Sequence, residues 1–136
     1  MINELIKLMI NQEKDLKNLL ELLKIQHKMI MEKDLFGLEG LVDKLNECGK
    51  EIAKEEIERR KILGENSILE VVNKSNNHEL IQVYNNIKST LKDTLAEKET
   101  NDLLLKQHIL FNTKMLNIMN PSRTIKTYTS YGSLSK

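Results

Sequence analysis

Residues 2–31 read INELIKLMINQEKDLKNLLELLKIQHKMIM, and apolar side chains return at every third or fourth position through the whole stretch. Seven of the nine positions in this repeat are apolar. This spacing predicts a helix with one buried face, close to the seam of a coiled coil. The polar Gln12 and Gln26 on that seam would either loosen the packing or set its register. The repeat consists of Ile2, Leu5, Met9, Gln12, Leu16, Leu19, Leu23, Gln26 and Ile30.

The following stretch, MEKDLFGLEGLVDK, predicts a turn near 32–35 and a second helix over about 35–63. Asp34 is a suitable N-cap, whereas Gly37 and Gly40 weaken the helix propensity after it. A single helix that bends across 32–35 is the competing interpretation. The seam expected for the second helix is Leu35, Leu38, Val42, Leu45, Gly49, Ile52, Glu56, Arg59 and Leu63.

Two further helices are predicted after Gly64, which marks a helix end. SILEVVNK forms a short amphipathic helix, and Asn76 or Asn77 can cap the one that follows. The last helix runs from about His78 to Met119, where Asn120-Pro121 stops it. Its expected apolar stripe is Leu80, Tyr84, Ile87, Leu91, Leu95, Leu105, Ile109, Leu116 and Met119.

These elements predict an all-α fold, an antiparallel, coiled-coil-like bundle of three long helices and one short helix. The helical domain is expected over residues 1–120, and residues 121–136 form a flexible C-terminal tail. This tail holds seven Ser or Thr residues, three cationic residues and no acidic residue. It has too few large apolar side chains to fold alone, but it could order on a partner, with tyrosine as an anchor.

Composition excludes several classes of protein. The net charge of +1 and the absence of a dense Lys and Arg stripe argue against nucleic-acid binding. No apolar run approaches the ~20 residues that a membrane-spanning helix needs. The N-terminus lacks the apolar core of a signal peptide, and the single Cys48 cannot form an internal disulfide. We therefore expect a cytoplasmic protein without membrane insertion.

The sequence offers no catalytic or metal-binding constellation. None of His27, His78 and His108 belongs to a Glu-x-x-His pair, the inward pairing of di-iron bundles. There is no phosphate-binding glycine loop, zinc cluster or nucleophile elbow. We expect neither enzymatic activity nor a cofactor nor a metal.

The end of the last helix looks too apolar for the cover that its partners can provide. Either the first helix packs on it, or an apolar groove stays open as a binding surface. Asn101 admits two interpretations. It is either a seam residue that fixes the pairing register, or, together with Asp102, the point where the internal core ends and a partner-binding portion begins.

Two motifs in this part of the chain resemble those of the FlgN-type flagellar export chaperones. The first is Asn-x-x-Leu-Leu followed by an aliphatic residue, here Asn101, Leu104, Leu105 and Ile109. The second is Tyr-x-x-x-Gly after the last helix, from Tyr128 to Gly132. The leucine-rich first helix also suits this family, so the resemblance covers essentially the whole chain.

The resemblance implies a chaperone that binds the C-terminal helical regions of flagellar hook–filament junction proteins and delivers them to the cytoplasmic domain of the type III export gate. It implies that Tyr128 docks on the gate, and Tyr131 is a second candidate for that role. A structural coiled-coil protein that self-assembles through its apolar stripe is the alternative, and a monomer or weak homodimer suits the chaperone. The implied client-binding residues are Leu104, Leu105, Ile109, Phe111, Met115, Leu116 and Met119.

Overall fold

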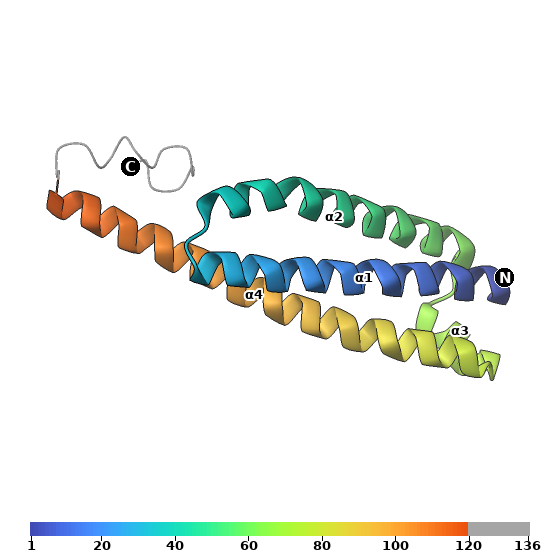
Figure 1. Cartoon of the computed structure of the whole chain (residues 1–136). Coiled ribbons are helices and arrows are strands. Elements are labelled where there is room, and N and C mark those ends of the chain that lie inside the picture. The colour runs from blue at the N-terminus through green and yellow to red at the C-terminus, as the bar shows by residue number, and fades with distance from the viewer. Residues whose placement is uncertain (120–136) are drawn as a thin grey trace. The chain divides into compact units, whose positions relative to one another are not determined.

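Four helices make up the computed structural model of the chain, which describes residues 1–119, with the side chains of 109–113, 115–116 and 118–119 left out (Figure 1). The predicted all-α fold with three long helices and one short helix is confirmed. The chain divides into two compact units, residues 1–101 and the part from Asp102 onward, and helix α4 contributes to both. The helices are α1 (Ile2–Met31), α2 (Leu35–Leu63), α3 (Ile68–Ser75) and α4 (His78–Met119).

Short polar side chains begin three of the four helices. Asp34, Ser67 and Asn77 each accept a hydrogen bond from a backbone N–H in the first turn, a group that has no partner within the helix. The predicted cap at Asp34 is confirmed, and of the two candidates before α4 it is Asn77 that caps. The bonds run from Gly37 N to Asp34 Oδ1 (2.9 Å), from Glu70 N to Ser67 Oγ (3.2 Å) and from Leu80 N to Asn77 Oδ1 (3.1 Å).

Backbone conformations with positive φ separate the first three helices. Lys33 has a φ of 57°, so the chain turns between α1 and α2 instead of continuing as one bent helix. Gly64 closes α2 with a φ of 63° and a hydrogen bond from its N–H to the carbonyl of Arg60. Glycine suits this position because it reaches positive φ without a steric penalty. Local chemistry therefore sets these boundaries.

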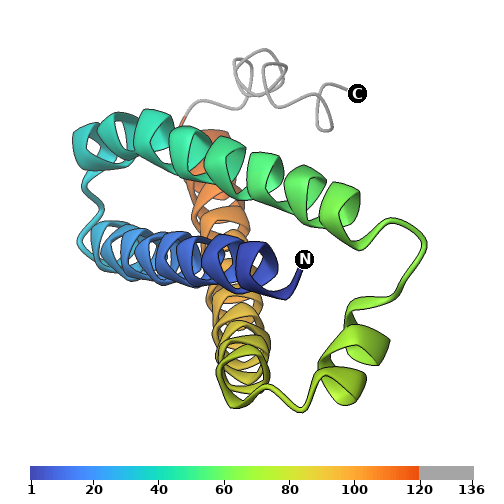
Figure 2. The ribbon, with the colours of Figure 1, turned by 90° about the vertical axis from the view of Figure 1, so that its right-hand side faces the viewer.

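Within the first unit, α1 lies between α2 and the part of α4 up to Asn101 (Figures 1 and 2). Helix α2 runs antiparallel to α1, and α4 again runs in the direction of α1, as in an up-down-up bundle. Helix α3 returns the chain to α4 at the end where α1 begins. The main core lies at this end and consists of Leu5, Ile6, Met9, Leu16, Leu63, Val72, Leu80, Val83 and Ile87.

The predicted seam of α2 is wrong at three positions, because Leu35, Val42 and Gly49 are exposed. Leu35 and Val42 are 74% and 50% exposed, whereas Leu41 is buried. The inward positions instead follow Leu38, Leu41, Leu45, Cys48 and Ile52, which are buried or half-buried. Leu35 is the first residue of α2, and Val42 lies beside the packed face of this helix.

The predicted stripe of α4 is wrong at Leu91 and Leu95, which are 43% and 51% exposed. Two threonines occupy the packed face instead, because Thr90 and Thr94 are buried. Thr94 donates its hydroxyl hydrogen to the carbonyl of Thr90 in its own helix (2.7 Å), so the hydroxyl group needs no partner in α1. Buried threonine therefore interrupts the aliphatic pattern on which the prediction relied.

Candidate functional site

Asn101 is buried completely at the end of the first unit, where α4 meets α1. Its side-chain amide donates to the carbonyl of Leu23 (2.8 Å) and to Oε1 of Gln26 (2.9 Å). Its Oδ1 lies 3.2 Å from Nδ1 of His27. We call this set of residues, Asn101 with Leu23, Gln26 and His27, the Asn101 clamp. These contacts place Asn101 on the seam between α1 and α4, and the boundary of the first unit also falls at this residue.

The hydrogen bonds of the clamp also define the proton on His27. Both N–H donors of Asn101 are used on α1, so its Oδ1 must accept from His27, and Nδ1 of that ring carries hydrogen. Oε1 of Glu97 lies 3.9 Å from the same nitrogen.

The packed face of α4 changes character along the helix. Leu80, Val83 and Ile87 are aliphatic and belong to the main core, whereas Thr90, Thr94, Glu97 and Asn101 continue the same three-and-four spacing with polar groups. In the described residues, no aliphatic side chain of α4 between Ile87 and Asn101 is buried. The clamp thus lies at the end of the stretch from Thr90 to Asn101. In this stretch α4 contributes little apolar surface to its contact with α1.

Residues beyond Asn101 form the second unit, and its described part is the end of α4, residues 102–119. Leu104 and Leu105 are half-buried, and Leu103 is exposed. The other five predicted client-binding residues lie on the helix, but their side chains are outside the described structure. They are Ile109, Phe111, Met115, Leu116 and Met119.

A second polar layer joins α1 and α2. Gln12 is buried and donates to Oε1 of Glu56 over 3.3 Å. Arg59 and Arg60 both donate to Oε2 of Glu56, at 2.6 and 3.4 Å. Burial alone would raise the pKa of Glu56, but the hydrogen bonds from Arg59 and Gln12 and the Arg59 charge hold it below its usual value. Gln12 thus contributes a polar contact between α1 and α2, and Gln26 contributes one between α1 and α4.

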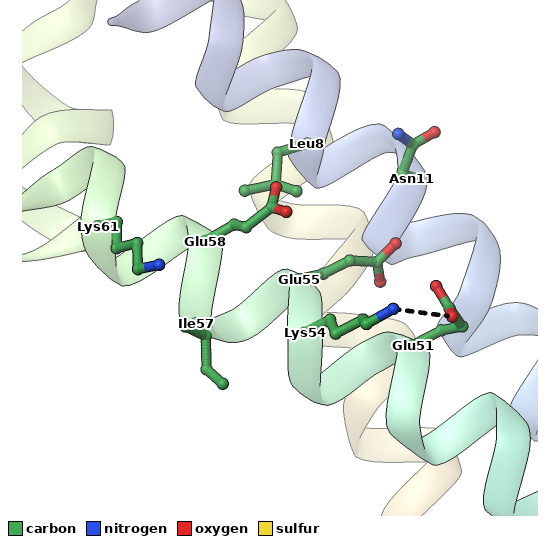
Figure 3. A pocket seen from close by; sticks show the side chains of 8 residues that line it. All are labelled: Leu8, Asn11, Glu51, Lys54, Glu55, Ile57, Glu58 and Lys61. Atoms are coloured by element: carbon green, nitrogen blue, oxygen red, sulfur yellow. Dashed lines mark ion pairs between the residues drawn. The ribbon is translucent and has the colours of Figure 1, made fainter.

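An open depression of about 470 Å³ lies between α1 and α2 (Figure 3). The Glu55 side chain extends from α2 toward α1. Burial, a hydrogen bond with Asp15 and the charges of Asp15, Glu51 and Glu58 raise its pKa to about 8. The lining contains no serine, threonine, cysteine or histidine. It consists of Leu8, Asn11, Glu51, Lys54, Glu55, Ile57, Glu58 and Lys61.

The chain matches a known protein family. The sequence model of the family described as "FlgN protein" matches residues 1–136, the whole chain. The chain belongs to the FlgN family. Membership of this family makes this FlgN protein a flagellar export chaperone. The comparisons with curated proteins and with solved structures gave no match.

The described part of this FlgN protein shows two further properties. None of the helices in residues 1–119 combines the length and the apolar character that a bilayer crossing requires. Over the same residues, no three His, Cys, Asp or Glu side chains come together as a metal site.

The family motifs of this FlgN protein fall on both sides of the unit boundary. Asn101 closes the first unit, whereas Leu104 and Leu105 belong to the second. The predicted gate-docking residues Tyr128 and Tyr131 lie outside the described residues. The sequence interpretation missed His27 as a partner of Asn101. The unbroken spacing from Leu80 through Asn101 could have placed Asn101 on the packed face of α4, but it does not identify His27 as the partner.

Proposed function

We propose that this FlgN protein binds the C-terminal helical regions of hook–filament junction proteins in the bacterial cytoplasm and delivers them to the export gate. The whole-chain family match supports the chaperone role. The junction proteins and the gate are the partners that the motifs around Asn101 and Tyr128 imply. Binding is stoichiometric and needs neither cofactor nor nucleotide.

The observation that carries this proposal is the course of α4. The first compact unit ends at Asn101, yet the helix continues without interruption to Met119. The sequence of this continuation is rich in large apolar residues with spacings of three, four and seven. Such spacing supports helix-in-groove recognition, in which an amphipathic client helix covers an apolar stripe. The proposed client-binding residues are Leu104, Leu105, Ile109, Phe111, Met115, Leu116 and Met119.

Flexible thioethers in this set favour recognition of more than one client. Met115 and Met119 have unbranched side chains that adapt to different apolar surfaces. A chaperone for two related junction proteins would benefit from such residues. We assign docking on the cytoplasmic domain of the export gate to the tail, through Tyr128 or Tyr131.

Calorimetric titration tests the client assignment. The full chain and a chain that ends at Asn120 are titrated with the purified C-terminal segments of the junction proteins from the same organism. We expect saturable binding near 1:1 by the full chain, and the shorter chain measures the contribution of the tail. A chain that keeps its helix content but binds no segment would refute the proposal.

Two further measurements separate the remaining roles. A tight oligomer whose mass does not change with concentration, without affinity for the segments, would favour the alternative of a structural coiled-coil protein.

For the gate, Tyr128→Ala and Tyr131→Ala are compared in binding to the purified cytoplasmic domain of the export gate. We expect one of them to weaken that binding while client binding stays unchanged. If both weaken the client complex tenfold, about 1.4 kcal/mol, the tail belongs to the client site.

A further inference from the structure

The side chain of Asn101 is closed to a client by burial and by its hydrogen bonds. It is 0% exposed, both of its N–H donors are used by Leu23 and Gln26, and its carbonyl oxygen accepts from His27. A client residue could reach this amide only after the clamp had opened. Opening would leave buried polar groups of α1 without partners, which is unfavourable.

The clamp is also the main polar tie between α1 and α4 in this part of the bundle. The packed face of α4 before it carries Thr90 and Thr94, and Thr94 bonds only within its own helix. The leucines of the same stretch, Leu91 and Leu95, face solvent to a large extent. With little apolar burial on α4 here, the hydrogen bonds of Asn101 decide how firmly α4 is held.

We propose that Asn101 acts in client binding as a positioning residue that holds α4 on α1, and that it does not touch the client. This inference rests on the proposed client site. Leu104 and Leu105 follow Asn101 within one turn of the same helix, so fraying of α4 at Asn101 unwinds the turn that carries them. An intact clamp keeps this turn helical before the client arrives.

Binding kinetics test the inference, with the purified C-terminal segment of a junction protein as probe. The variants are Asn101→Ala, Gln26→Ala, His27→Ala and the double variant Asn101→Ala/His27→Ala, each at a temperature where it is fully folded. A smaller fraction of binding-competent helix lowers the association rate and spares the dissociation rate. We expect about fivefold to tenfold slower association for Asn101→Ala and slower association for the α1 variants. The association rate of the double variant should be no lower than that of the slower single variant.

Thr100→Ala is the matched control, because Thr100 is the exposed neighbour of Asn101 and its hydroxyl bonds only within α4. It should bind like the wild-type chain. Faster dissociation of Asn101→Ala together with unchanged α1 variants would show that Asn101 contacts the client, which overturns the inference. Unchanged kinetics in all variants would also overturn it.

Hydrogen exchange in the free protein separates this inference from the proposed function. Asn101→Ala should speed amide exchange in residues 90–105, and Thr100→Ala should not. If the wild-type chain binds no junction segment, the proposed function fails. If exchange in Asn101→Ala equals that of the wild-type chain, the clamp does not hold α4, and the positioning role is refuted whatever the client does.

Discussion

The side-chain amide of Gln12 in α1 donates a hydrogen bond to the carboxylate of Glu56 in α2 over 3.3 Å, inside the contact between the two helices. The same carboxylate lies 2.6 Å from Arg59, whose side chain is mostly buried. One acidic residue therefore satisfies donors from both helices. Its removal would leave both without their acceptor.

Glu56→Ala should lower the free energy of unfolding by about 1–2 kcal/mol, because a mostly buried guanidinium and a buried amide lose their acceptor. Urea unfolding at neutral pH measures the change. Glu21→Ala is the control, since Glu21 forms an exposed pair with Lys24 at 3.6 Å and should cost less than about 0.5 kcal/mol. Equal losses in the two variants would contradict a special role for Glu56.

Glu55 should make the fold less stable as pH rises. Its pKa in the folded protein is about 8, above the usual 4.5, so between these values the folded state holds a proton that the unfolded state has lost. Stability should therefore fall from pH 5 to pH 8. Glu55→Gln should flatten this fall by on the order of 1 kcal/mol. Urea unfolding of both proteins at pH 5, 6.5 and 8 measures it, and parallel curves would refute the assignment.

Two glycines in the first turns of α2 should respond in opposite ways to alanine. A Cβ at Gly40 meets no atom within 4 Å, so Gly40→Ala should raise stability by about 0.5–1 kcal/mol through helix propensity. A Cβ at Gly37 would collide with the Asp34 carboxyl that caps α2. Gly37→Ala should therefore bring no gain or a loss of up to about 1 kcal/mol.

Asp34 supplies the control for this pair. In the background Asp34→Ala the obstructing carboxyl is gone, so Gly37→Ala should then stabilise the protein much as Gly40→Ala does. Thermal unfolding of the four variants measures these differences. A stabilising Gly37→Ala in the wild-type background would show that the cap tolerates a side chain there.

Leu105→Asp should weaken binding of the junction-protein segments more than tenfold while helix content stays nearly unchanged, because a carboxylate opposes an apolar client surface. Leu95→Asp is the control, since Leu95 is 51% exposed in the first unit. Calorimetry and circular dichroism provide the two readouts. Loss of the whole fold in Leu105→Asp would assign Leu105 to the internal core.

Helix boundaries could be predicted because their causes are local. Asp34, Gly64 and Asn77 act within one turn of the ends that they define. The packed face of α4 could not be predicted from its own composition. Thr90 and Thr94 are polar, and their burial depends on the opposing face of α1, which the sequence of α4 does not contain.

The Asn101 clamp shows the same limit. Asn101 itself was a candidate for register, but its partner His27 lies 74 residues away in sequence, and nothing in either segment predicts the other. The client-binding assignment rests on the family motifs and on the course of α4 beyond Asn101.

The main core joins residues that are far apart in sequence, because Leu5 and Met9 belong to the same cluster as Leu80 and Val83. A chain emerging from the ribosome can pair α1 with α2 early, but α1 cannot bury its second face until the start of α4 has been synthesised. Contacts so distant in sequence slow folding, since a long loop must close before they form. During synthesis the α1–α2 hairpin would thus keep apolar side chains uncovered for a time, and exposed apolar surface of this kind favours aggregation.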